Sequence, residues 1–371
     1  PVPAQDIAMA GYTGPVGSKE RNYTSSVARS SASIRSYRTL QPGEGLTLVA
    51  SWPKGVVPEP GLWQKFVYLL QDNLGLLLAL AALLLSASYL HMIWRRYGRD
   101  PAVGVIIPRY QPPVNYSPAS ARYVRRMGYD STVFAAAIIN LAVKGYITIT
   151  NNDGDFQLQR KTSNQPLAPG ESTLFNLLFV GGPQLELDNK NHPVIGKAAS
   201  SHKKALERDY RNIYFRLNTA KVLPSLLGSA AVSAIIGVLH VFTPLVIGVV
   251  VLNTFLHGIY VYLLRAPTPR GRLLLDKLSG FKLYLEVAEQ EDLNRAHPPE
   301  KTPELFERFL PYAVALGVEQ AWAEQFAGVF EGLTGESAGT YKPAWYHGQF
   351  DSTRLSRFAG AMGGSFSTAI S

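Results

Sequence analysis

Three long apolar blocks dominate the hydropathy pattern of the chain, and none of them contains Asp, Glu, Lys or Arg. They are Leu74–Trp94, Val222–His240 and Leu245–Leu264. A helix of about 20 residues crosses the roughly 30 Å hydrocarbon core of a bilayer. We therefore predict a first transmembrane helix within residues 63–97 and a helical hairpin over residues 222–264. The alternative, buried helices of a soluble core, fits poorly because uncharged runs of this length are rare outside membranes.

Residues 1–62 have a different pattern, in which apolar and polar residues alternate. Leu46–Trp52 reads LTLVASW, as in a half-buried strand, and its surroundings are rich in Gly, Ser, Thr and Pro. So short a segment cannot close a β sandwich, so we expect the end of an extracytoplasmic β domain, or a loosely ordered remnant of one. Because Pro1 is not preceded by an export signal, we expect a processed chain or a fragment.

Residues 98–221, between the first two blocks, carry the signals of helices and of a hairpin. Ser117 followed by Pro118 is typical of a helix start, and a second helix is expected from Asp130 to Gly145. Two alternating stretches around the turn at 151–155 then predict a β hairpin. Two helices followed by a hairpin predict a winged-helix-like module with mixed α+β structure.

Winged-helix modules commonly bind DNA through a recognition helix in the major groove. Here the second helix, residues 131–143, reads STVFAAAIINLAV without a charged side chain, and only Lys144 follows it. A packing or protein-contact role is therefore favoured over reading of DNA. Nucleic acid is not expected as a partner.

Residues 265–330 are expected to form cytoplasmic amphipathic helices. Apolar residues recur at helical spacing over 270–295, and Thr302–Pro303 begins a further helix. Four large side chains are candidates for contact with a protein partner or a second copy of the chain: Phe281, Tyr284, Leu285 and Trp322. Residues 331–371 are rich in Gly, Ser and Ala, so we expect a flexible tail.

Cations flank the apolar blocks. Arg95, Arg96 and Arg99 follow the first block directly, and Arg265 follows the hairpin. Residues 95–221 contain 18 Lys and Arg against 9 Asp and Glu, an excess of +9 that equals the net charge of the whole chain. Because basic flanks stay in the cytoplasm, the N-terminus is expected outside a bacterial inner membrane. Residues 95–221 and the C-terminus are then cytoplasmic.

The same cations are candidates for contact with the phosphate of anionic lipid headgroups. The candidates are Arg95, Arg96, Arg99, Arg122, Arg125, Arg126, Arg265, Arg270 and Arg272. The phosphate of nucleic acid offers the same chemistry. Most of these cations lie close to the predicted membrane, however, which favours lipid.

Sequence patterns typical of enzymes are absent. There is no HExxH, GxSxG, P-loop or GxGxxG pattern and no Cys, so we expect no enzymatic activity, cofactor or metal. His257 lies about 10 Å inside the hairpin from its Arg265 end, where an ionisable group normally has a partner or a purpose. The favoured interpretation is a neutral His bonded to Asn253 or to a backbone carbonyl. The alternative is a proton or ion path.

Several motifs together resemble the YciQ-like predicted membrane proteins of bacteria. In chain order they are PRYQPP, SPASARYVRRMGYDSTVFAAAIINLAVKGYITI, GFKLYLEVAEQEDLNR and LPYAVALGVEQAW. Near the start, LQPGEGLT is similar to the end of that family's extracytoplasmic β domain. The resemblance covers nearly the whole chain and implies an inner-membrane protein. Because the family is a domain of unknown function, the resemblance implies no activity and no catalytic residues.

These observations favour a non-enzymatic scaffold or sensor that links an extracytoplasmic β domain to a cytoplasmic protein-interaction module. One alternative is a membrane-tethered transcription regulator. Another is an oligomeric proton or ion transporter that uses His257. The expected partners are the lipid bilayer, with anionic lipids, and a further protein or a second copy of the chain.

Overall fold

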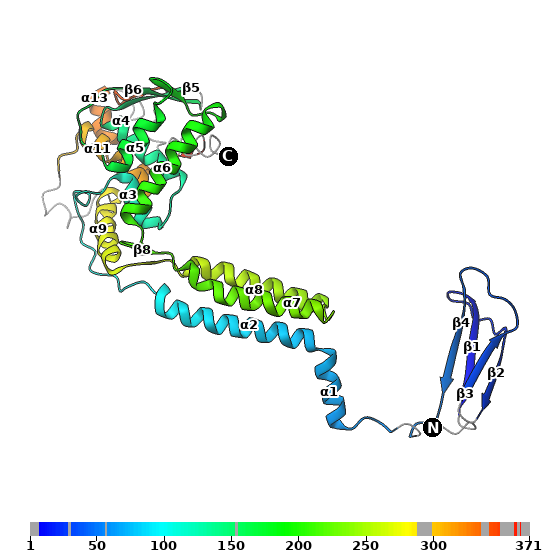
Figure 1. Ribbon diagram of the computed structural model, residues 1–371. Coiled ribbons are helices and arrows are strands. Elements are labelled where there is room, and N and C mark those ends of the chain that lie inside the picture. Colours follow the sequence, from blue (N-terminus) through cyan, green and yellow to red (C-terminus); the bar gives the residue numbers. More distant parts are fainter. Residues whose placement is uncertain are drawn as a thin grey trace. The chain divides into compact units, whose positions relative to one another are not determined.

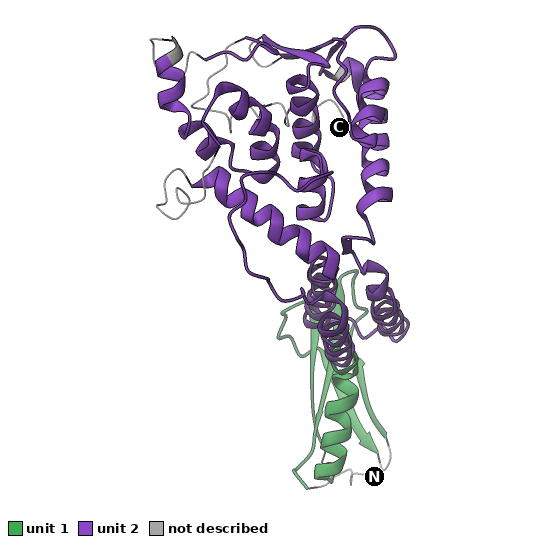
Figure 2. Cartoon of the chain, turned by 90° about the vertical axis from the view of Figure 1, so that its left-hand side faces the viewer, with its two compact units in different colours: residues 1–78 green, residues 79–371 purple. Residues whose placement is uncertain are grey.

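The computed structural model of the chain describes residues 7–28, 31–55, 58–152, 155–287, 299–334, 341–348, 360, 361 and 364. The chain divides into two compact units, Pro1–Leu78 and Ala79–Ser371, which Figure 2 shows in green and purple. The first unit contains the N-terminal strands. The second contains most of the apolar helices and the whole mixed α+β region.

The first unit contains two antiparallel strand pairs and a helix. Its elements are β1 (Ala8–Pro15), β2 (Tyr23–Ala28), β3 (Ser31–Ser36), β4 (Glu44–Ser51) and α1 (Leu62–Asp72). β1 pairs with β4 and β2 pairs with β3. The two strand pairs pack closely against each other at Gly11 of β1. A Cβ atom added to this glycine would lie only 2.4 Å from Ile34 Cδ1 of β3. β4 confirms the strand predicted at Leu46–Trp52.

Among the described residues, three segments are helical, long and apolar enough to cross a membrane: Leu74–Gly98, Thr219–Val238 and Pro244–Leu263. Their main helices are α2 (Leu74–Ile93), continued by the π-helix η2 (Trp94–Gly98), α7 (Leu223–Val238) and α8 (Pro244–Leu263). These bounds confirm the three predicted membrane helices. One boundary needs correction, because residues 63–72 belong to the separate helix α1. Asn73 ends α1 with φ −110° and ψ 15°, outside the helical range.

The second unit also contains an α+β module, defined as the described parts of residues 99–221 and 265–348. Its first elements are α3 (Pro118–Arg126), α4 (Ser131–Val143), β5 (Ile147–Asn152), β6 (Asp155–Arg160), α5 (Pro169–Leu178), β7 (Gln184–Glu186) and α6 (His192–Tyr210). The sheet has the strand order β10-β5-β6-β7, in which β10 is Tyr346–His347. Both views show the helices on one side of this sheet (Figures 1 and 2). The antiparallel pairing of β5 with β6 confirms the predicted hairpin.

Side-chain caps explain where the first two module helices begin. Ser117 Oγ accepts a hydrogen bond from Ser120 N at 3.2 Å, and Asp130 Oδ1 accepts one from Val133 N at 2.9 Å. Such caps satisfy N–H groups that have no partner within the helix. The uncharged helix α4 is buried over Val133–Ala142, so it forms the centre of the module core.

Four further helices complete the core: α9 (Pro269–Glu286), α11 (Pro303–Leu316), α12 (Glu319–Glu324) and α13 (Ala327–Thr334). The predicted helix over 270–295 is therefore shorter, although residues 288–298 lie outside the described part. The four expected partner-contact residues Phe281, Tyr284, Leu285 and Trp322 are all buried inside this core. The expectation of exposed contacts needs correction, since α11 and α12 cover the apolar face of α9.

Part of the expected flexible tail belongs to the core. β10 (Tyr346–His347) pairs parallel with β5, and the neighbouring Trp345 is buried. Trp345 Nε1 also donates to Glu307 Oε2 at 3.0 Å. Two large aromatic side chains in a Gly- and Ser-rich context are enough to fix this segment on the sheet. The tail residues at 335–340, 349–359, 362–363 and 365–371 lie outside the described part.

A buried histidine makes the module sensitive to acid. His202 in α6 is fully buried, its Nδ1 lies 3.1 Å from the Tyr129 hydroxyl, and its Nε2 has no hydrogen-bond partner among the described residues. Burial lowers the pKa of His202 to about 4, because a charged imidazolium would lose its hydration. The neutral form is therefore the one that the fold accommodates.

We predict that this histidine makes the free energy of unfolding fall as the pH drops. Below pH 6.5 the unfolded chain binds a proton that the folded chain rejects, so about 3 kcal/mol is lost between pH 7 and pH 4. Thermal unfolding of the whole chain in detergent should show this loss reduced in His202→Gln. The exposed His192→Gln is the control and should retain it. Equal acid sensitivity of both variants would contradict the assignment.

Candidate functional site where the spans meet the module

A two-stranded ribbon joins the α7–α8 hairpin to the α+β module. β8 (Phe215–Arg216) precedes α7 and pairs antiparallel with β9 (Ala266–Pro267), which follows α8. Thr268 extends this contact, since its N–H donates to Tyr214 O at 2.9 Å and its hydroxyl donates to Ile213 O at 2.6 Å. The entry and the exit of the hairpin are thereby held together at the module.

Asn218 links the module ends of all three spans. Its Nδ2 group donates to Tyr97 O in η2 and to Leu264 O after α8, both at 3.1 Å. Asn218 also directly precedes the short helix η4 (Thr219–Val222) that leads into α7. Its backbone has a left-handed φ of 53°, which Asn adopts more readily than most residues. The side chain of Asn218 therefore bonds to the ends of two spans, and its backbone leads directly into the third.

Next to this junction lies a pocket of about 730 Å³. It is formed by the end of the first span, the loop after α3 and the end of α8. Its lining residues are Trp94, Gly98, Arg99, Asp100, Arg125, Arg126, Met127, Gly128, Tyr129, Asp130, Tyr262, Leu263 and Arg265. Four of the predicted phosphate-contact arginines therefore meet in one pocket, although they are far apart in the sequence.

Three of these four arginines have little compensation for their charge. Arg265 Nε is buried without a hydrogen-bond partner among the described residues, and its guanidinium lies 5.7 Å from the centre of the Tyr262 ring. Arg99 is exposed and lies 5.8 Å from the Trp94 ring. Arg126 reaches the Asp130 carboxylate only at 4.0 Å. The pocket thus offers an anion one buried donor without a partner, Arg265 Nε, and a surplus of positive charge, since its four arginines outnumber its two carboxylates, Asp100 and Asp130.

The fourth pocket arginine, Arg125, has a structural partner. Its Nη1 donates to Leu316 O at 2.5 Å, at the C-terminal end of α11. Burial lowers the pKa of Arg125, and the charges of Arg122 and Arg126 act in the same direction. Concentrating cations here is therefore electrostatically costly, and a bound anion would relieve that cost.

The other predicted phosphate contacts fall into two groups. Arg122 donates to Asp130 at 2.7 Å and to Ala315 O at 3.1 Å, and Arg272 pairs with Asp276 at 2.6 Å. These two side chains are mostly buried, so they serve the fold. The second group is exposed and lies outside the pocket: Arg95, Arg96 and Arg270.

Inside the span bundle, His257 belongs to a hydrogen-bond network. Its Nδ1 lies 2.7 Å from Asn253 O, and its Nε2 lies 3.0 Å from Ser225 Oγ. Asn253 Nδ2 donates to Ser229 Oγ at 3.0 Å, and that hydroxyl lies 2.9 Å from Ser86 Oγ. The network joins α2, α7 and α8. Hydrogen bonds of His257 to a backbone carbonyl agree with the favoured interpretation of its role.

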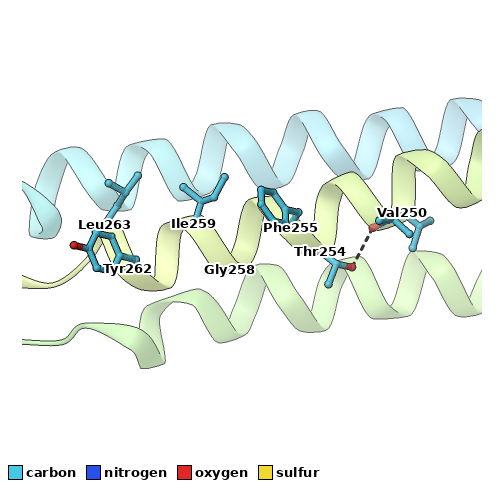
Figure 3. A pocket seen from close by; sticks show the side chains of 8 residues that line it. Val250, Thr254, Phe255, Gly258, Ile259, Tyr262 and Leu263 are labelled. Carbon is cyan, nitrogen blue, oxygen red and sulfur yellow. Dashed lines mark hydrogen bonds between the residues drawn. The ribbon is translucent and has the colours of Figure 1, made fainter. Parts of the chain in front are cut away.

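A groove of about 720 Å³ runs along the outer face of α8 (Figure 3). Its lining is almost wholly apolar. It carries two hydroxyls, those of Thr254 and Tyr262, and the Thr254 hydroxyl donates to Val250 O at 3.0 Å. The groove offers van der Waals contact to lipid or to another helix but no chemistry. The arginine pocket is therefore the better candidate for a specific site.

Sequence reasoning missed several residues that form these sites. In the sequence, Asn218 is one polar residue of a linker. The structure shows that its hydrogen bonds reach residues 121 and 46 positions away in the chain, which local patterns cannot predict. Ser86 stood out in the sequence only as a polar residue inside an apolar helix. Such residues in membrane helices often bond across helix interfaces, which is the signal that could have found them.

Comparison with known proteins places this arrangement in a family. Residues 107–326 match the family described as "Predicted membrane protein (DUF2207) C-terminal domain". The chain belongs to this family. It is also 27% identical over 187 residues to the Escherichia coli (strain K12) protein named "Uncharacterized protein YciQ". The resemblance to YciQ-like membrane proteins is thereby confirmed.

The match to the E. coli relative is partial. It covers 47% of this chain and 29% of the relative, so the chain spans less than a third of that relative's length. No solved structure matches the chain. The family match nevertheless includes Arg125, Arg126, Asn218 and Arg265, so most of the junction lies in the family's C-terminal domain.

We predict that the junction depends on the two donors of Asn218. Asn218→Asp places a carboxylate against two carbonyl oxygens, so the free energy of unfolding should fall by about 2–4 kcal/mol. Asn218→Gly preserves the left-handed backbone but leaves both carbonyls without their donor, and should lose only about 1 kcal/mol. Thermal unfolding of the whole chain in detergent measures both. An Asp variant as stable as the natural chain would exclude this role.

Proposed function

We propose that the chain is a non-enzymatic scaffold or sensor of the bacterial inner membrane. In this proposal the N-terminal β unit lies outside the cell, and the α+β module lies in the cytoplasm as a protein-interaction module. The supporting observation is the arginine pocket, where the cations next to the spans gather on the module side. Cations next to spans tend to stay in the cytoplasm, which supports this orientation.

The arginine pocket binds the phosphate of an anionic lipid headgroup in this proposal. The pocket lies at the ends of the first span and of α8, with Trp94 and Tyr262 on its wall. Trp and Tyr are the side chains that prefer the membrane interface, which is the depth of a headgroup. Basic pockets between membrane helices on the cytoplasmic side suit such headgroups. The buried Arg265 Nε would receive its acceptor from the phosphate.

The order α3, α4, β5 and β6 supports a winged-helix-like module that packs rather than one that reads DNA. α4, in the place of a recognition helix, is buried over Val133–Ala142 and has no free face. Lys144 at its end already donates to Pro166 O at 2.9 Å and lies 3.6 Å from the buried carboxylate of Glu171. Packing within the module therefore explains α4 better than contact with a DNA duplex.

We predict that anionic lipid stabilises the chain through the pocket arginines. The thermal midpoint of the whole chain should rise in nanodiscs that contain phosphatidylglycerol, compared with phosphatidylcholine alone. The triple variant Arg99→Gln, Arg126→Gln, Arg265→Gln should lose most of this rise, because it removes the charge-assisted bonds to phosphate.

A matched triple variant separates the pocket from general surface charge. Arg95→Gln, Arg96→Gln, Arg270→Gln removes the same charge from exposed positions outside the pocket and should retain the rise. Equal loss in both variants, or loss in neither, would refute the headgroup site. A second arm adds inorganic phosphate to the phosphatidylcholine sample. A rise with phosphate alone would show that the pocket takes a soluble anion and would also refute the headgroup site.

We also predict the orientation of the two units. The chain has no cysteine, so single cysteines report accessibility without background. Val16→Cys in the β unit and Val180→Cys in the module replace strongly exposed residues. In spheroplasts, a membrane-impermeant maleimide should label Val16→Cys at once and Val180→Cys only after lysis. The reverse order would overturn the proposed linkage across the membrane.

A further inference from the structure

The helix α1 exposes an apolar face that no described residue of the first unit covers. Leu62 is 88% exposed, Trp63 is 74% exposed and Leu69 is 59% exposed, and no residue of α1 is buried. Large apolar side chains in water are unfavourable, and a helix of 11 residues is marginal alone. This face therefore needs an occupant.

The residues of α1 are sorted strictly by face. Helical spacing places Leu62, Phe66 and Leu69 in one row and Trp63, Val67 and Leu70 in the next. The opposite side is formed by Gln64, Lys65, Tyr68, Gln71 and Asp72. This arrangement, with aromatic residues and a charged polar face, is typical of a helix that lies in a membrane interface.

The connection to α2 selects the bilayer as the occupant. Asn73 is the one residue between α1 and Leu74, where the first candidate span begins. The end of α1 is therefore held at the lipid surface. α1 does not extend the span, because α1 and α2 together would be about 48 Å long, well beyond the roughly 30 Å core. Lys65 and Asp72 also oppose burial within the core.

We propose that α1 is an interfacial helix that lies on the bilayer surface at the N-terminal end of the first span, with Leu62, Trp63, Phe66 and Leu70 inserted among the lipids. In this position the helix fixes the depth of the first span. This inference rests on α1 and Asn73 alone, so it is independent of the arginine pocket.

Spin labelling of the whole chain in lipid vesicles tests this proposal. Single cysteines at Phe66, Leu70, Gln64 and Gln71 carry the label, in vesicles of phosphatidylethanolamine and phosphatidylglycerol. Oxygen collides with labels in lipid, and a nickel chelate collides with labels in water. The oxygen-to-nickel ratio should be several-fold higher at Phe66→Cys and Leu70→Cys than at Gln64→Cys and Gln71→Cys.

Two reference positions calibrate the measurement. Leu84→Cys, on the exposed side of α2, supplies the lipid value, and Val16→Cys supplies the water value. Water-like ratios at all four α1 positions would overturn the proposal. Labels at Phe66 and Leu70 that are immobile and shielded from both reagents would also overturn it, because they would indicate a protein occupant. Since all four positions are unburied, the substitutions leave the core intact.

Discussion

The carboxamide of Asn218 is the contact on which the junction of spans and module depends. The last carbonyls of a helix lack partners within it. Asn218 supplies donors to Tyr97 O and Leu264 O, which follow from different spans. Because these ends are fixed, Arg99 and Arg265 stay close to the cations of α3. A structural hydrogen bond thus creates the positive pocket.

The arginines around this pocket divide according to the partner that the fold provides. Burial alone would raise the pKa of Asp130, but its hydrogen bonds with Arg122 and the charge of that guanidinium lower it overall. The same carboxylate caps α4 through Val133 N, so Arg122 is committed to the core. Arg126 is mostly exposed and contacts Asp130 only at 4.0 Å. Only the uncommitted cations remain available to a phosphate.

Local rules predicted much of this fold, whereas contacts between distant segments were beyond them. The length of the uncharged apolar runs predicted the three spans, and the capping residues Ser117 and Asp130 predicted where α3 and α4 begin. Helical spacing marked Phe281 as apolar but could not tell that the chain itself covers it. Likewise, the Gly- and Ser-rich composition of the tail predicted flexibility, whereas Trp345 within it is buried. The sequence marked each arginine of the pocket as a candidate for phosphate contact. It could not show that arginines so far apart in the chain line the same pocket.

The polar network in the spans is explained by helix packing. His257 Nδ1 faces the Asn253 carbonyl oxygen, which can only accept, so Nδ1 is the donor of this hydrogen bond, and Nε2 lies 3.0 Å from Ser225 Oγ. Both ring nitrogens therefore have a hydrogen-bond partner inside the bundle. The hydroxyls of Ser86 and Ser229 continue the contact to α2. Apolar side chains pack against lipid nearly as well as against another helix, so apolar contacts alone favour association of the helices only weakly. Lipid tails cannot form hydrogen bonds, so this network favours contact among the three helices.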